Sequence, residues 1–219
     1  MSTFIPVNRK CTVCGKNHRF RALMSTTVFG PPDLDNRPDM LKRATLGLEI
    51  QMCDSCFYAN YDISKRPNGM KEITLKSEEY LAVVNNEAIS QTAKAFWLSS
   101  IIHSQSGDYK IAGFLALKAA WVFDDYCNSA YAKLLRETAI KHFEKDIAPE
   151  YHSDVNCAAI LTDMKRRVGD FDGAIAIAEH LINHGVEASL EQIMKFQIKL
   201  CKSEDTRCHR EPDVKKNKG

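Results

Sequence analysis

The chain has 219 residues, of which 44% are hydrophobic and 26% are charged, and its formal net charge is +2. That length suits one or two domains with a real core, and the nearly balanced charge excludes a chain that binds polyanions over its whole surface. No stretch approaches the roughly 18 apolar residues that span a bilayer, and residues 1–6 lack the apolar core of a signal peptide. We therefore expect a cytoplasmic protein with no membrane partner.

Two C-x-x-C pairs separated by 38 residues stand in the first third of the chain, and they consist of Cys11, Cys14, Cys53 and Cys56. In a reducing cytosol such pairs are more often metal ligands than disulfides, because one tight turn presents both sulfurs to the same ion. The spacing predicts a structural Zn²⁺ site, with a rubredoxin-like iron or redox centre and metal-free thiols as alternatives. Gly15 suits such a turn, whereas Phe57 makes the second turn less typical.

The segment between the cysteine pairs contains β-like patterns. Residues 45–52 alternate strictly, which predicts a strand that leads directly to Cys53. Residues 19–29 end in a β-branched run and are the predicted partner strand. Strands that lead into cysteine pairs are typical of zinc ribbons and rubredoxin-like modules, so residues 1–76 are predicted to form a small metal-binding β module.

A loop rich in proline and aspartate lies between these predicted strands, and its candidate functional residues are Asp33, Asp35, Arg37 and Asp39. One interpretation is a second cation site formed by the three carboxylates, although the spacing is not that of an EF-hand. The other is structural: Asp33 and Asp35 form local side-chain-to-backbone turns, and Arg37 pairs with one of them.

Helix signals dominate from residue 77 to residue 202. Ser77 is a predicted N-cap followed by two acids, and a last helix is predicted from Ser189, with Gln192 completing a capping box. A helix is also predicted at residues 129–145. Residues 203–219 are polar, basic at their end and without periodicity, which predicts a disordered tail.

Two segments of the helical part resemble each other. Helices predicted at residues 93–104 and 155–168 each end in a Gly-Asp-aromatic turn, at residues 107–109 and 169–171, and a second helix with small residues at matching offsets follows. This pattern is typical of a tetratricopeptide repeat (TPR). The spacing of 62 residues is not a multiple of 34, so we predict a TPR-like antiparallel array with two recognisable units. The fold class is therefore α+β and mainly α.

Few residues of the helical part suggest chemistry. Trp121, Asp124 and Asp125 form a possible surface motif, although Trp121 is more often a core residue in such a context. His180 and His184 stand four residues apart, but the zinc-protease pattern is absent, and surface or helix-capping roles are expected. No motif provides a nucleophile with its base, so the sequence favours a protein that is not an enzyme.

The combination of motifs resembles a bacterial family called domain of unknown function 2225. The resemblance rests on the two cysteine pairs, the loop at residues 29–38 and residues 119–125, and it covers about residues 8–200. It implies a zinc-ribbon-like head and a TPR-like body with no established activity. It also draws attention to the loop, because recurrence of a whole loop is hard to attribute to core packing.

The sequence therefore predicts a zinc-binding, non-enzymatic adaptor for a protein partner, with partner and oligomeric state left open. One alternative is nucleic-acid binding through a basic head, with Phe20 or Tyr58 stacking on bases. The basic residues of that alternative are Arg9, Lys10, Lys16, Arg19, Arg21, Lys42 and Arg43. Another is a redox or hydrolytic enzyme that uses the four cysteines or the Asp-rich loop.

Overall fold

The computed structural model describes residues 2–210 and residue 213, and the chain packs as two compact units. The first unit consists of Met1–Phe29 and Met40–Leu135, and the second consists of Gly30–Asp39 and Arg136–Gly219. The chain thus enters the second unit for ten residues, returns to the first, and leaves it again within helix α5. The predicted boundaries at residues 76 and 202 follow composition and not packing, and they stay a prediction.

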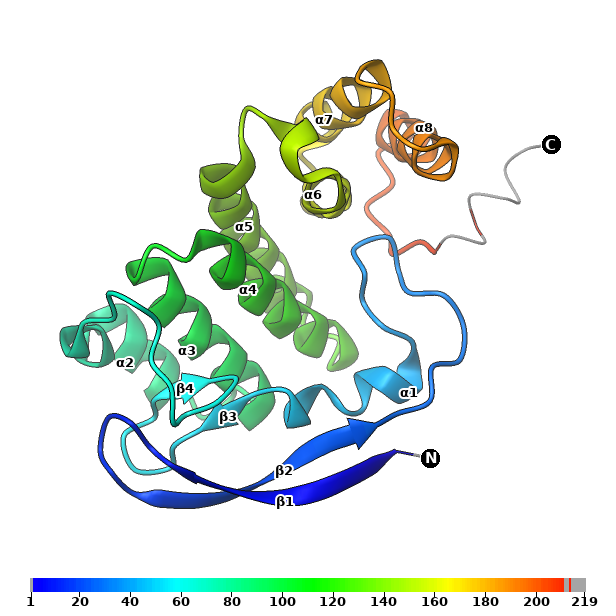
Figure 1. Ribbon diagram of the computed structural model, residues 1–219. Helices are drawn as coiled ribbons and strands as arrows, with labels where there is room; N and C mark the ends of the chain where they lie inside the picture. Colours follow the sequence, from blue (N-terminus) through cyan, green and yellow to red (C-terminus); the bar gives the residue numbers. More distant parts are fainter. Residues whose placement is uncertain (1, 211–212, 214–219) are drawn as a thin grey trace. The chain divides into compact units, whose positions relative to one another are not determined.

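Two small antiparallel sheets carry the cysteine turns of the first unit (Figure 1). Strand β1 (Thr3–Lys10) pairs with β2 (Asn17–Ser25), and β3 (Gln51–Met52) pairs with β4 (Ala59–Asn60). The partner predicted for residues 19–29 was therefore wrong, because β2 pairs with β1 and not with a strand at residues 45–52.

Only the last two residues of the predicted strand at residues 45–52 form a strand, so most of this prediction was wrong. Helix α1 (Met40–Arg43) is followed by a 3₁₀ turn, η1 (Leu46–Leu48), and only Gln51–Met52 is a strand. The hydroxyl of Thr45 donates to the Lys42 carbonyl at 2.7 Å. A Cβ atom on Gly47 would lie 2.9 Å from Thr92 Oγ1, so glycine allows this turn to approach the helix that begins at Gln91 closely.

Helices complete the first unit. A 3₁₀ turn, η2 (Glu72–Lys76), leads into α2 (Glu78–Asn85), where Ser77 Oγ accepts from the Tyr80 N–H at 3.3 Å as the sequence predicts. Helices α3 (Gln91–Gln105) and α4 (Tyr109–Asp125) follow, and they pack against each other. The predicted Gly-Asp-aromatic turn connects them. Ser100 joins them, because its hydroxyl donates to the Ala112 carbonyl at 2.8 Å.

The second unit contains the other helices. Helix α5 (Ser129–Ile147) crosses from the first unit into the second, and the short 3₁₀ helix η3 (Tyr151–Asp154) follows it. The remaining helices are α6 (Val155–Val168), α7 (Phe171–Asn183) and α8 (Ala188–Lys202). Gly169 ends α6 at φ +93°, as the predicted turn requires. Helix α8 begins before Ser189, so the predicted capping box is wrong.

The fold class predicted from the sequence is confirmed: the protein is α+β and mainly α, with a small zinc-ribbon-like module. Both predicted helix pairs form, α3 with α4 and α6 with α7. The two pairs belong to different compact units, and the TPR-like arrangement stays a prediction. Among the described residues, no helix has the length and apolarity that crossing a membrane requires.

The predicted disordered tail requires a correction for its first residues. Arg166 Nη1 donates to the carbonyls of Asp205 and Arg207, at 2.5 and 2.9 Å, and the Leu34 N–H donates to the His209 carbonyl at 2.9 Å. Arg166 is fully buried, and these carbonyls join the carboxylate of Asp163, 2.6 Å from its Nη2, in satisfying the guanidinium. Residues 211–212 and 214–219 of the predicted tail lie outside the described residues.

Candidate metal centre

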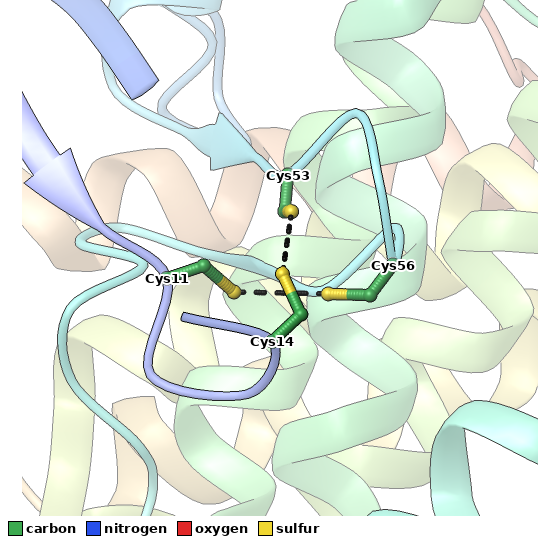
Figure 2. A group of neighbouring side chains, drawn as sticks. All are labelled: Cys11, Cys14, Cys53 and Cys56. Carbon is green, nitrogen blue, oxygen red and sulfur yellow. Dashed lines mark hydrogen bonds between the residues drawn. The ribbon is translucent and has the colours of Figure 1, made fainter. Parts of the chain in front are cut away.

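The four predicted cysteine ligands come together from two turns (Figure 2). Cys11 and Cys14 lie in the turn between β1 and β2, and Cys53 and Cys56 lie in the turn between β3 and β4. The Sγ atoms of Cys11 and Cys56 are 3.7 Å apart, and those of Cys14 and Cys53 are 3.5 Å apart. Two thiolates bound to one tetrahedral Zn²⁺, each at about 2.3 Å, lie about 3.8 Å apart. The cluster therefore has the size and donor set of a four-cysteine metal site.

Both turns have the same backbone hydrogen bonds. In the first turn, the Cys11 N–H donates to the Lys16 carbonyl at 2.8 Å, and the Gly15 N–H donates to the Cys11 carbonyl at 2.9 Å. The second turn repeats this pattern, since the Cys53 N–H donates to the Tyr58 carbonyl and the Phe57 N–H to the Cys53 carbonyl, both at 2.9 Å. The two turns thus present their sulfurs with matching geometry.

Phe57 adopts the backbone conformation that glycine adopts in the first turn. Its φ is +58°, against +75° for Gly15, and a residue with a side chain costs about 1–2 kcal/mol in this region. The Tyr80 hydroxyl, which is fully buried on α2, donates to the Phe57 carbonyl at 2.7 Å. Helix α2 therefore holds the second turn in place, and the missing glycine does not change the turn geometry.

Without a metal, the four thiols differ in acidity. A hydrogen bond from the Lys16 backbone lowers the pKa of Cys14 to about 7, and the Cys14 side chain is exposed. Burial raises the pKa of both Cys53 and Cys56. A bound divalent cation removes this difference because its ligand thiols are deprotonated outright. In the metal-free protein, Cys14 would be the most reactive of these thiols.

His18 is a neighbour of the centre that sequence reasoning missed. It lies on β2, and its Nε2 is 3.2 Å from Cys53 Sγ, while its Nδ1 is 3.4 Å from an Asp54 carboxylate oxygen. Protonated at Nε2, the ring donates a hydrogen bond to the Cys53 thiolate. Such outer hydrogen bonds orient ligands and adjust metal affinity. The only sequence signal for His18 is its position four residues after Cys14.

The Asp-rich loop lies in the second unit, where its charged residues Asp33, Asp35, Arg37 and Asp39 are all buried. Asp35 is fully buried, and one carboxylate oxygen lies 3.3 Å from Arg136 on α5 and 3.0 Å from Arg167 on α6. Its other oxygen accepts from the Arg37 N–H at 3.1 Å. This is the local turn of the structural interpretation, with two distant arginines added.

Asp33 is bound from two sides. Arg37 lies 3.8 Å from one carboxylate oxygen, as the structural interpretation predicts, and Arg210 lies 3.0 Å from the other. Within the described residues, the groups whose ligand atoms converge do not include these carboxylates, so the cation-site interpretation gains no support. The loop also borders a cavity of about 190 Å³ against α6 and α8. A functional role for the loop stays a prediction.

The possible surface motif on α4 is only partly at the surface. Trp121 is 5% exposed and lies among the buried residues of the first unit, in agreement with the core interpretation that the sequence favours for it. Asp125 lies 3.1 Å from Arg43 of α1 in an ion pair, and Asp124 is half-buried. The ion pair lies within the first unit, and a functional role for the motif stays a prediction.

A family model described as "Uncharacterized protein conserved in bacteria (DUF2225)" matches residues 7–203 of the chain. The match covers both cysteine pairs, the Asp-rich loop and helices α1 to α8. Neither the curated proteins nor the solved structures contain a match to the chain.

Proposed function

Because the chain belongs to the uncharacterised bacterial family DUF2225, we propose its function from its own geometry: a non-enzymatic adaptor that binds a protein partner. In this proposal one structural Zn²⁺, held by Cys11, Cys14, Cys53 and Cys56, supports the first unit. Four protein ligands fill a tetrahedral zinc ion and leave no position for a substrate, which is typical of a structural site. The protein acts in the cytoplasm, where the thiols stay reduced.

A group of exposed apolar side chains carries the proposal of a protein partner. The β1–β2 hairpin has the cysteine turn at one end, and Phe4, Ile5 and Met24 lie at its open end. They are 46%, 45% and 63% exposed, and we call them the hairpin patch. Phe4 and Ile5 are successive residues of β1 and point to opposite faces of the hairpin, so the apolar groups share its open end and not one face. Exposed apolar groups that are concentrated in this way are typical of protein contacts. The metal centre lies at one end of the hairpin and the patch at the other, where the Arg21 guanidinium stacks on the Phe4 ring at 3.4 Å.

Metal analysis tests the zinc part of the proposal. Purified protein should contain one zinc per chain, and the Cys11→Ser, Cys53→Ser double variant should lose it, whereas Cys208→Ser, which changes an exposed cysteine of the second unit, should keep it. Zinc should also protect Cys14 from alkylation. An iron centre would instead give a coloured protein. Unchanged metal content in the double variant would refute the ligand assignment.

Co-purification from the bacterial host tests the adaptor part. The wild-type protein and a Phe4→Ser, Met24→Ser variant should differ in the proteins they retain. Ile73→Ser is the matched control, because Ile73 is 67% exposed and lies outside the hairpin. A partner retained by wild type and control, and lost by the patch variant, supports the proposal. Equal retention by all three proteins would refute the hairpin patch as the binding surface.

Nucleic-acid binding is the second candidate, and one observation favours it. The strand register places Lys10, Arg19 and Arg21 on one exposed face of the hairpin. Two of the other predicted basic residues have their charge offset by a carboxylate, since Arg9 pairs with Asp62 at 3.1 Å and Arg43 pairs with Asp125. The predicted stacking by Tyr58 was wrong because its side chain is fully buried.

Binding of a fluorescent single-stranded oligonucleotide tests this candidate. Binding at about 50 mM salt that weakens as salt rises, and that is lost in an Arg19→Gln, Arg21→Gln variant, would favour it over the adaptor. Ile73→Ser serves as its control, since Ile73 is exposed and lies outside the hairpin that carries those cations. No binding at low salt would end this candidate.

A further inference from the structure

Three histidines of the second unit lie together: His152, His180 and His184. His152 is on η3, whereas His180 and His184 are one helical turn apart at the end of α7. One ring nitrogen of each lies within 4.8 Å of the other two, and all three side chains reach solvent. We propose that they form a second metal site, at the surface, for a divalent transition-metal ion such as Zn²⁺.

The closest pair of nitrogens already has the spacing of a shared ion. His152 Nδ1 lies 3.3 Å from His180 Nε2. Two imidazole nitrogens that bind one tetrahedral Zn²⁺ at about 2.0–2.1 Å also lie about 3.3 Å apart. The His184 ring lies 4.0 Å from the His180 ring and 4.8 Å from the His152 ring, measured between centroids. Because one nitrogen of His184 already lies within 4.8 Å of a nitrogen of each other ring, small side-chain adjustments bring all three to one ion.

A backbone hydrogen bond sets the tautomer of His184 that a metal needs. Its Nδ1 donates to the His180 carbonyl at 2.8 Å, so the proton is on Nδ1 and Nε2 keeps the lone pair that a metal needs. Metal-binding histidines commonly donate their other ring nitrogen to a carbonyl in this way. The same bond satisfies a carbonyl at the end of α7, which is the capping role that the sequence predicts. Capping and metal binding are therefore compatible.

The segments that carry the histidines are fixed by other contacts. The Asp154 carboxylate accepts from the Cys157 N–H at 3.1 Å, and so attaches η3 to the start of α6. The Tyr151 ring packs edge-on against His180, with centroids 5.7 Å apart. Because the backbone is held in this way, binding an ion needs only side-chain rotation, and little order has to be created.

The donor set decides the class of ion. Three neutral imidazoles suit zinc, copper and nickel, whereas calcium and magnesium prefer oxygen ligands. Three protein ligands leave one tetrahedral position for water, unlike the closed four-cysteine centre. The proposed site therefore exchanges its ion with solvent more readily than the cysteine centre. Neither site depends on the other.

Calorimetric titration of the full-length, zinc-loaded protein with Zn²⁺ tests the site. Wild type should bind one further equivalent, and His152→Gln and His180→Gln should each weaken this step at least about tenfold, the smallest loss typical even for an outer-shell partner. His209→Gln is the control, because His209 pairs with Asp205 elsewhere in this unit and should not affect binding. The Cys11→Ser, Cys53→Ser variant should keep the histidine site, which separates this test from that of the proposed function.

Nuclear magnetic resonance of the imidazole nitrogens gives a second measurement that does not depend on variants. Zn²⁺ should shift the ring signals of His152, His180 and His184, and leave those of His209 unchanged. Absence of a further equivalent in the titration would overturn the proposal. So would equal weakening by His209→Gln, or a shift confined to other histidines.

Discussion

The cysteine centre and the Asp-rich loop are both held by charged or ionisable groups. They differ in how far along the sequence the interacting groups lie. Each cysteine turn makes its own backbone hydrogen bonds, and its two ligands are separated by only two residues in the sequence. The carboxylate of Asp35 instead meets Arg136 and Arg167, which lie 101 and 132 residues further along the chain. The first region can be identified from local spacing, and the second cannot.

The difference also concerns how each region stabilises the protein. The first unit has small sheets of short strands, so in our proposal an ion provides much of the folding free energy there. The second unit buries ion pairs among packed helices, where breaking one pair leaves an uncompensated charge. Removal of metal and removal of a carboxylate should therefore destabilise different parts of the chain.

Metal removal should have the largest effect. Structural zinc contributes about 10–16 kcal/mol in zinc-finger peptides, so chelation should unfold the cysteine turns and their strands. Amide hydrogen exchange should accelerate at residues 2–25 and 51–60, and stay unchanged in α6–α8. Equal acceleration in both units, or in neither, would contradict a local structural role for the metal.

Asp35→Ala should reverse this pattern. It leaves Arg136 and Arg167 buried without this carboxylate, which typically costs about 3–5 kcal/mol. Denaturant unfolding should show the loss, and faster hydrogen exchange should be confined to the second unit. Asp146→Ala is the control, because Asp146 is an exposed carboxylate of α5, and its change should stay within about 0.5 kcal/mol. A neutral Asp35→Ala would mean that these ion pairs add nothing to stability.

His18→Phe should weaken metal binding without unfolding the protein. The substitution removes the ring nitrogen 3.2 Å from Cys53 Sγ and keeps an aromatic ring on β2. Loss of an outer-shell hydrogen bond typically lowers metal affinity about 10–100-fold, and competition with a chelator measures it. Arg19→Gln, on the next residue of the strand, should keep the wild-type affinity. An unchanged affinity for His18→Phe would show that this contact has no effect on the metal.

The two cysteine turns offer the smallest test. Gly15→Ala should lower stability by about 1 kcal/mol, because alanine is strained at a φ of +75°. Phe57→Gly should raise stability by at most about 1 kcal/mol, since relief of the same strain is offset by a more flexible unfolded chain. Thermal unfolding of the zinc-loaded variants measures both changes. A Gly15→Ala variant that is more stable than wild type, or a Phe57→Gly variant that is less stable, would contradict the equivalence of the two turns.

An element can be predicted from the sequence when the contacts that form it are between residues close together in the chain. The helices around the Gly-Asp-aromatic turns follow from local patterns, and Ser77 caps α2 as its sequence indicates. Strand β1 has no comparable sequence pattern. Neither face of the hairpin is fully buried, so its strands need no strict alternation of apolar and polar residues. The leucines at 46 and 48 do alternate, but Gly47 allows a 3₁₀ turn to pack closely against Thr92.

The candidate sites divide in the same way. The ligand set of the cysteine centre can be predicted because both pairs have the spacing of a metal-binding turn. His152 could not be assigned from the sequence, since its partner His180 lies 28 residues away on another element. The ion pairs of Asp35 could not be assigned either, although local pairing of Arg37 with Asp33 could.

The passage of residues 30–39 through the second unit has a consequence for synthesis on the ribosome. At about 5–20 residues per second, Asp35 waits on the order of 5–20 s before Arg136 is made, so its final partners are absent while the first unit is being translated. A fragment that begins at residue 136 would likewise lack the carboxylates of this segment. No single cut in the gene separates the two units intact, and expression of the second unit alone would require residues 30–39 as a grafted or added peptide.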